Sequence, residues 1–267
     1  MKRALLIIAL QALAFWDVWR WYASRAVYSW DQPWGVLALV AAVVFLMVSR
    51  KPWPQTERSL WLPMLLVMFY AATFFLFSPL ARATVAFTAL AVTTSSLRFG
   101  KSFHPGLFGL FYLSLPTLPT LQFFGGYPLR IVVAELTAPI LRMSGFAVIA
   151  EGTCLNWAGR MIWIDAPCSG IKMLWVGLFL TFVVLCVHEL PLLKTLLVLP
   201  LVGVVIMAAN VFRAVALFYL ETGVLNSPSW GHEYAGVIAF VLEAAGIISI
   251  VLMLKRRNVC VVATSTI

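Results

Sequence analysis

Three residues near the C-terminus have side chains that could together carry out acyl transfer. Cys168 and His232 each lie directly before an apolar run, and Arg213 lies directly after one. If each run crosses a membrane once, the chain brings all three residues to the same membrane face. They would then lie on consecutive antiparallel helices, which commonly pack about 8–10 Å apart. The pattern predicts a site with a cysteine nucleophile at one membrane surface.

The surroundings of Cys168 favour a reactive thiol. A thiolate is the nucleophilic form of cysteine, and the unpaired N–H groups and dipole of a helix N-terminus stabilise it. Asp165 or Ser169 could cap the helix that begins here, and Pro167 is tolerated in a first turn. We therefore expect Cys168 at the start of the sixth span to be the nucleophile.

The other two residues supply the remaining chemistry. Arg213 keeps its charge at any working pH, so it could stabilise a thiolate or a developing oxyanion. Imidazole side chains exchange protons near neutral pH, so His232 could exchange a proton with the thiol or with a leaving amine. Asn210 lies one helical turn before Arg213 on a similar face, where it could orient the guanidinium or a substrate carbonyl.

Each of these residues also has a structural interpretation. Cys168 could be a small packing residue, or it could form a disulfide with Cys154. Arg213 could extend its charged end to the membrane surface. His232 could cap the last helix or pair with Glu221.

The composition identifies the class of protein that must position these residues. Hydrophobic residues make up 63% of the 267 residues, charged residues make up 11%, and the mean hydropathy is +0.97. A soluble or disordered chain does not have such a composition, so we predict one all-α integral membrane domain over residues 1–267. About eight transmembrane helices are expected, at residues 4–21, 34–48, 60–77, 80–97, 105–121, 171–187, 192–212 and 234–254.

Basic residues predict the orientation of these spans. Eleven of the nineteen Lys and Arg residues fall on one side if both termini are cytoplasmic, so the positive-inside rule places the candidate site on the outer face. The net charge of +9 is then explained by cytoplasmic loops, and we expect no nucleic-acid partner. We predict a multi-pass membrane protein with both termini in the cytoplasm.

The stretch 122–167 is the one sizeable segment outside the predicted spans, and we expect it to be an extracytoplasmic insertion. Residues 129–149 could form a helix that lies on the outer surface or re-enters the membrane. Residues 153–157 and 160–165 flank Ala158-Gly159, which is typical of a small hairpin. This hairpin would lead the chain to Asp165 and Cys168.

Three local patterns resemble the exosortase/archaeosortase family. They are Ala166-Pro167-Cys168-Ser169-Gly170, Asn210-Val211-Phe212-Arg213 and His232-Glu233-Tyr234-Ala235-Gly236, which occur in this order. The resemblance covers a catalytic motif region at residues 163–254. It implies a cysteine protease, or transpeptidase, of the inner membrane that removes the C-terminal sorting tail of exported proteins through a Cys thioester. Such a tail has a short motif of the PEP-CTERM kind, a transmembrane helix and a basic end.

By this resemblance Cys168 is the nucleophile, Arg213 the stabiliser of the transition state and His232 the acid and base. The implied partners are exported proteins with such a tail, together with membrane lipids, and the acceptor amine stays open. No cofactor or metal site is expected, because the four cysteines lack CxxC spacing and the three histidines are far apart.

Two other functions remain compatible with the sequence. Glu243 and Arg82 lie within predicted spans and would suit the polar path of a transporter or lipid flippase. That function requires Glu243 and tolerates substitution of Cys168. A non-catalytic subunit of an envelope polysaccharide system would tolerate substitution at all three outer residues.

Overall fold

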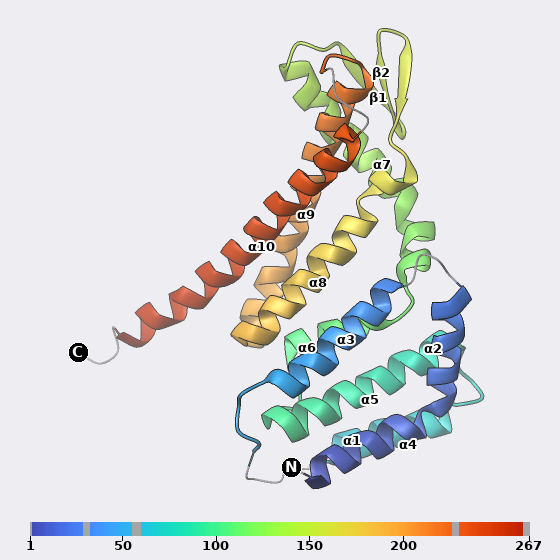
Figure 1. Ribbon diagram of the computed structural model, residues 1–267, viewed down its shortest axis with the longest axis vertical. Helices are drawn as coiled ribbons and strands as arrows, with labels where there is room; N and C mark the ends of the chain where they lie inside the picture. The colour runs from blue at the N-terminus through green and yellow to red at the C-terminus, as the bar shows by residue number, and fades with distance from the viewer. Residues whose placement is uncertain (1, 29–32, 55–59, 226–229, 264–267) are drawn as a thin grey trace. The chain divides into compact units, whose positions relative to one another are not determined.

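The computed structural model describes residues 2–28, 33–54, 60–225 and 230–263 (Figure 1). The chain divides into two compact units. The first comprises Met1–Thr117 and Phe182–Leu192, and the second comprises Leu118–Thr181 and Leu193–Ile267. The single membrane domain with an outer insertion at 122–167 stays a prediction.

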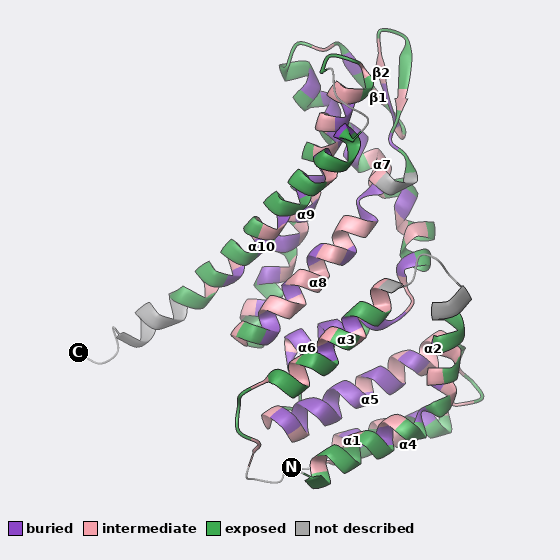
Figure 2. Cartoon of the chain, viewed as in Figure 1, coloured by how far each residue is buried: buried purple, intermediate pink, exposed green. Residues whose placement is uncertain are grey.

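Helix α5 forms the centre of the first unit. The unit contains α1 (Lys2–Ala14), α2 (Trp16–Tyr28), α3 (Pro33–Val48), α4 (Trp61–Ala72), α5 (Pro79–Phe99), α6 (Pro105–Ser114) and the end of α8. Helices α1, α2, α4 and α6 all contact α5, and most of its residues from Ala83 on are buried (Figure 2). Many of these residues are Ala, Ser or Thr, whose small side chains let membrane helices approach closely.

The second unit combines long helices with a small sheet. It contains α7 (Leu118–Met143), β1 (Val148–Glu151), β2 (Cys154–Trp157), β3 (Arg160–Trp163), the 3₁₀ turn η1 (Ala166–Ser169), most of α8 (Ile171–His188), α9 (Leu192–Glu221) and α10 (Gly231–Ala263). The strands form an antiparallel sheet in the order β1-β2-β3.

The predicted hairpin is confirmed as β2 and β3. Its two turn residues, Ala158 and Gly159, have φ values of 50° and 80°, as a tight two-residue hairpin turn requires. The sequence did not predict the third strand, β1. The predicted helix over residues 129–149 extended too far at its C-terminal end. Helix α7 stops at Met143, and Gly145 takes a φ of 91° before the chain enters β1.

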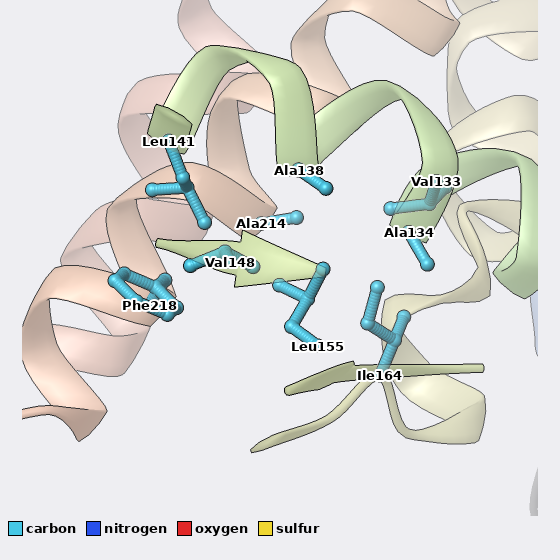
Figure 3. Packing of buried hydrophobic residues seen from close by; sticks show 9 residues of the cluster. All are labelled: Val133, Ala134, Ala138, Leu141, Val148, Leu155, Ile164, Ala214 and Phe218. Atoms are coloured by element: carbon cyan, nitrogen blue, oxygen red, sulfur yellow. The ribbon is translucent and has the colours of Figure 1, made fainter. Parts of the chain in front are cut away.

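An apolar core holds the sheet against α7 and α9 (Figure 3). Phe218 of α9 is 1% exposed and its ring lies 5.3 Å from that of Phe146 and 5.7 Å from that of Trp157. The fully buried members come from α7, the sheet, the segment before η1 and α9: Val133, Ala134, Ala138, Leu141, Val148, Leu155, Ile164, Ala214 and Phe218. This packing fixes the segment that leads into Cys168.

The protein is a mainly helical, multi-pass membrane protein, as predicted. Within the part of the chain that the structure describes, four helices are long and apolar enough to cross a membrane: α5, α8, α9 and α10. Two bent pairs, α1 with α2 (66°) and α6 with α7 (91°), raise the number to six if each pair is one span. Two shorter apolar helices, Trp34–Val48 and Trp61–Ala72, account for the rest of the eight predicted segments.

The predicted straight span at 105–121 differs from the structure. Helix α6 ends at Ser114, because Leu115 precedes a proline and adopts an extended conformation (φ −65°, ψ 143°). The chain then turns by 91° into α7. Many residues of α10 are exposed (Figure 2), and several of them are apolar, including Val237, Ile238 and Val241, as expected of a helix that faces lipid.

Candidate functional site

Cys168, Arg213 and His232 line one cavity in the second unit, with a volume of about 220 Å³. The hairpin and the following segment form one wall, and α9 forms another. The remaining lining residues are Leu155, Ile162, Trp163, Ile164, Asp165, Ala214, Leu217, Phe218 and Glu221. The three residues that the sequence singled out, 45 and 19 positions apart, are therefore neighbours in space.

Cys168 lies on the 3₁₀ turn η1, before α8 begins at Ile171. Its N–H donates to the Asp165 carbonyl (2.8 Å). Gly170 then takes a φ of 83°, which an L side chain rarely adopts, and redirects the chain into α8. Cys168 therefore lies directly before the sixth span, as predicted, on a short 3₁₀ turn that the sequence did not predict.

The predicted capping residues contribute unequally. The Asp165 side chain makes no capping hydrogen bond to η1. The Ser169 hydroxyl is 2% exposed and accepts from the Ile171 N–H at 3.5 Å, which is the long limit for such a bond. Asp165 is instead an exposed wall residue of the cavity.

Asn210 ties α9 to the turn that carries Cys168. Its amide is 2% exposed, and Nδ2 donates to the Cys168 carbonyl (3.2 Å). A Cβ atom at Gly170 would lie 2.7 Å from the same nitrogen, so only glycine fits there. The sequence placed Asn210 correctly beside the site, but the hydrogen bond shows that it holds the backbone of the candidate nucleophile.

Arg213, Leu217 and Glu221 follow one another at four-residue intervals along α9, and all three side chains line the cavity. Arg213 is half-buried and His232, the second residue of α10, is exposed. A Cβ atom at Gly236 would lie 3.8 Å from the Arg213 Nε. Arg213 therefore packs close to α10 one turn after His232.

Burial raises the pKa of the Cys168 thiol above its ordinary value. The Arg213 guanidinium lowers this pKa, while the carboxylates of Asp165 and Glu221 raise it. The net direction is upward, so the protonated thiol predominates at neutral pH. Desolvation of the thiol outweighs the single nearby cation, and this burial was not predicted from the sequence.

Sequence reasoning did not assign Glu221 or the hairpin residues Leu155, Ile162 and Trp163 to the site. Glu221 was considered only as a pairing partner of His232, and the two groups do interact electrostatically. Its four-residue spacing from Arg213 through Leu217 is a signal that could have identified it. The hairpin residues depend on how the sheet packs, which spacing alone does not predict.

Other residues considered from the sequence lie elsewhere. Arg82 forms an ion pair with Asp17 (2.9 Å) in the first unit. Glu243 is fully buried in α10, and neither carboxylate oxygen has a hydrogen-bond partner in the described part of the chain. Cys154 is a buried free cysteine of β2, so the structure contains no disulfide between Cys154 and Cys168.

Comparison with known proteins identifies the family. The family model described as "Transmembrane exosortase (Exosortase_EpsH)" matches residues 4–249. The chain therefore belongs to the transmembrane exosortase family, whose members process C-terminal sorting signals. No curated protein and no solved structure matches the chain.

Proposed function

We propose that this transmembrane exosortase is a cysteine protease or transpeptidase that cleaves the C-terminal sorting tail of exported proteins. Cys168 is the nucleophile, Arg213 stabilises the oxyanion, and His232 transfers protons. The observation that carries this proposal is the presence of these three side chains around one 220 Å³ cavity. The tail motif is of the PEP-CTERM kind.

The reaction begins with a neutral thiol, because the pKa of Cys168 is raised. His232 takes the thiol proton as the sulfur attacks the scissile carbonyl, which makes the C–S bond and places negative charge on the oxygen. Arg213 stabilises that charge. The intermediate collapses to a thioester, and the imidazolium gives its proton to the leaving amine of the tail.

The second half of the reaction frees the enzyme. An acceptor amine or water attacks the thioester, His232 takes the proton of the attacking group, and the thiol is restored. Glu221 interacts with the imidazole that performs both transfers. The apolar wall formed by the hairpin and Phe218 excludes water from one side of the reacting carbonyl.

The positive-inside distribution of Lys and Arg supports a site that faces the periplasm or exterior, with both termini in the cytoplasm. In this orientation, the tail's transmembrane helix lies beside the protein with its basic end inside. The cleavage motif then emerges near Cys168 at the outer surface of the inner membrane.

A comparison of C-terminal peptides in membrane and surface fractions tests the proposal. Cells carry the unchanged protein, Cys168→Ala, or Cys186→Ala as a matched control, because Cys186 is a free cysteine of the first unit. We expect a set of exported proteins to keep their C-terminal helix only with Cys168→Ala. Normal removal of these tails by a well-expressed Cys168→Ala protein would exclude the proposed nucleophile.

A further inference from the structure

An apolar groove of about 810 Å³ lies in the first unit, distinct from the cavity around Cys168. Helix α3, the segment that follows it, helix α6 and the end of α8 form its walls. The apolar lining residues are Ala41, Val44, Phe45, Val48, Leu110, Val183, Cys186 and Val187. Its volume is within the range of about 300–1,000 Å³ that is typical of small-molecule sites.

One end of the groove is polar and positively charged. Ser49, Arg50, Lys51 and Glu189 line this end. Lys51 donates to the Glu189 carboxylate, and Lys101 Nζ lies 3.6 Å from the same oxygen. The apolar walls thus lead to a cluster in which one carboxylate faces two lysines.

Two further groups determine the charge of this end. Arg98 donates to the Ser49 carbonyl, and its guanidinium lies 4.9 Å from the centre of the Trp53 ring. His104 is 2% exposed, and burial lowers its pKa, so its imidazole is neutral near pH 7. The described residues at this end therefore carry three more positive charges than negative ones, from Arg50, Lys51, Arg98 and Lys101 against Glu189.

A ligand that matches this groove needs an apolar chain and an anionic head. We propose that the groove binds an anionic phospholipid, with an acyl chain along α3 and the phosphate at Arg50 and Lys51. Basic pockets between membrane helices on the cytoplasmic side are suited to such head groups, and that leaflet is rich in anionic lipid. A substrate tail fits less well, because its basic end would meet the surplus positive charge.

Glu189 limits the strength of the site. Its carboxylate forms ion pairs with Lys51 and Lys101. Burial raises the pKa of this carboxyl, but its interactions with these two lysines and with His104 lower it more, so the pKa lies below the usual value. It therefore stays charged at neutral pH and competes with a lipid phosphate for the same lysines. Removing this charge should strengthen binding of the phospholipid, whereas removing the basic groups should weaken it.

Native mass spectrometry of the full chain tests this inference. The purified protein is reconstituted with equal amounts of phosphatidylglycerol and phosphatidylcholine that have identical acyl chains. The lipid that stays bound to the protein is then identified by its mass. We expect one retained phosphatidylglycerol, with roughly thirtyfold preference over phosphatidylcholine from the two exposed basic groups. The double variant Arg50→Gln/Lys51→Gln should lose this preference, and Glu189→Gln should increase it.

Two further variants separate the groove from general charge effects. Lys255→Gln/Arg256→Gln removes two positive charges outside the groove and should keep the preference. Val44→Phe places a larger side chain in the apolar part of the groove, so it should reduce the retention of both lipids. Val44 is 49% exposed, so this substitution does not disturb a buried core.

Three results would overturn the inference. They are equal retention of the two lipids by the unchanged protein, an unaltered preference in Arg50→Gln/Lys51→Gln, and displacement of phosphatidylglycerol by a synthetic tail helix with a basic end. The groove is independent of the chemistry at Cys168. A normal lipid result with failed tail processing, or the reverse, therefore distinguishes the two proposals.

Discussion

The two compact units use their charged side chains differently. In the first unit, the carboxylates that the structure describes are matched with cations: Asp17 pairs with Arg82 and with Arg20, and Glu189 pairs with Lys51 and Lys101. In the second unit, Arg213, His232, Asp165 and Glu221 surround a cavity that also contains a free thiol. The difference teaches that charged side chains of a membrane protein indicate a reaction site when they surround a reactive atom, such as the Cys168 sulfur, and a structural role when they pair with one another.

The largest effect is expected when one arginine is replaced in each unit, and this pair of variants tests the comparison directly. Arg213→Gln should lower the rate of tail processing by about 10²–10³-fold, because it removes a group that stabilises the oxyanion. Thermal unfolding should change little. Arg82→Gln should instead lower the unfolding temperature, since Asp17 keeps only its exposed partner Arg20, and should leave the rate per folded molecule unchanged.

The two arginine variants are measured in one assay of processing and one of thermal unfolding. If Arg82→Gln lowered the processing rate per folded molecule as much as Arg213→Gln, the contrast between the units would be wrong.

The next effect concerns the packing of α8 against α10 in the second unit. A Cβ atom at Gly177 would lie 2.1 Å from the Glu243 Oε1 and 2.7 Å from the Ile206 Cδ1. Gly177→Ala should therefore destabilise the protein by about 1–3 kcal/mol, the usual cost of overpacking. Gly203→Ala is the matched control, because no atom lies within 4 Å of a Cβ there.

This packing prediction is measured by thermal unfolding in detergent. Combining Gly177→Ala with Glu243→Ala should recover part of the loss, because the closest clashing atom is then absent. A transporter function makes a different prediction, in which Glu243→Gln abolishes activity while Cys168→Ala has no effect.

A several-fold effect is expected from the charges around Cys168. Glu221 raises the pKa of this thiol and Arg213 lowers it. Glu221→Gln should therefore lower the pKa and speed alkylation by iodoacetamide at pH 7, whereas Arg213→Gln should raise the pKa and slow it. The pH profile of alkylation measures both shifts. If the pKa of the Cys168 thiol shifted equally and in the same direction in both variants, the assignment of these charges would be contradicted.

The smallest effect is expected at the ion pair of Lys51 with Glu189. The Lys51 side chain is 56% exposed, so Lys51→Gln should lower stability by no more than ~1 kcal/mol. Tail processing should be unchanged. A large loss of thermal stability would indicate that this pair anchors the first unit more strongly than its exposure suggests.

The sequence predicted the hydrophobic elements, and it predicted that Cys168, Arg213 and His232 lie close together, because both follow from local signals and the order of the apolar runs. Apolar runs identified the helices, and the Ala158-Gly159 turn identified the hairpin. It could not predict the bend before α7 or the strand β1, because these depend on how the chain packs after Leu115 and Gly145. It did not predict the burial of the Cys168 thiol by the hairpin and α9, because this burial depends on tertiary contacts.

The most direct test of the central claim is detection of the thioester on Cys168. Purified protein is mixed with a peptide that contains a cleavable tail, quenched in acid, digested and analysed by mass spectrometry. We predict that the peptide containing Cys168 carries the N-terminal part of the substrate, and that hydroxylamine removes it. Cleavage of the tail without any adduct on Cys168, at an unchanged rate in Cys168→Ala, would contradict the account.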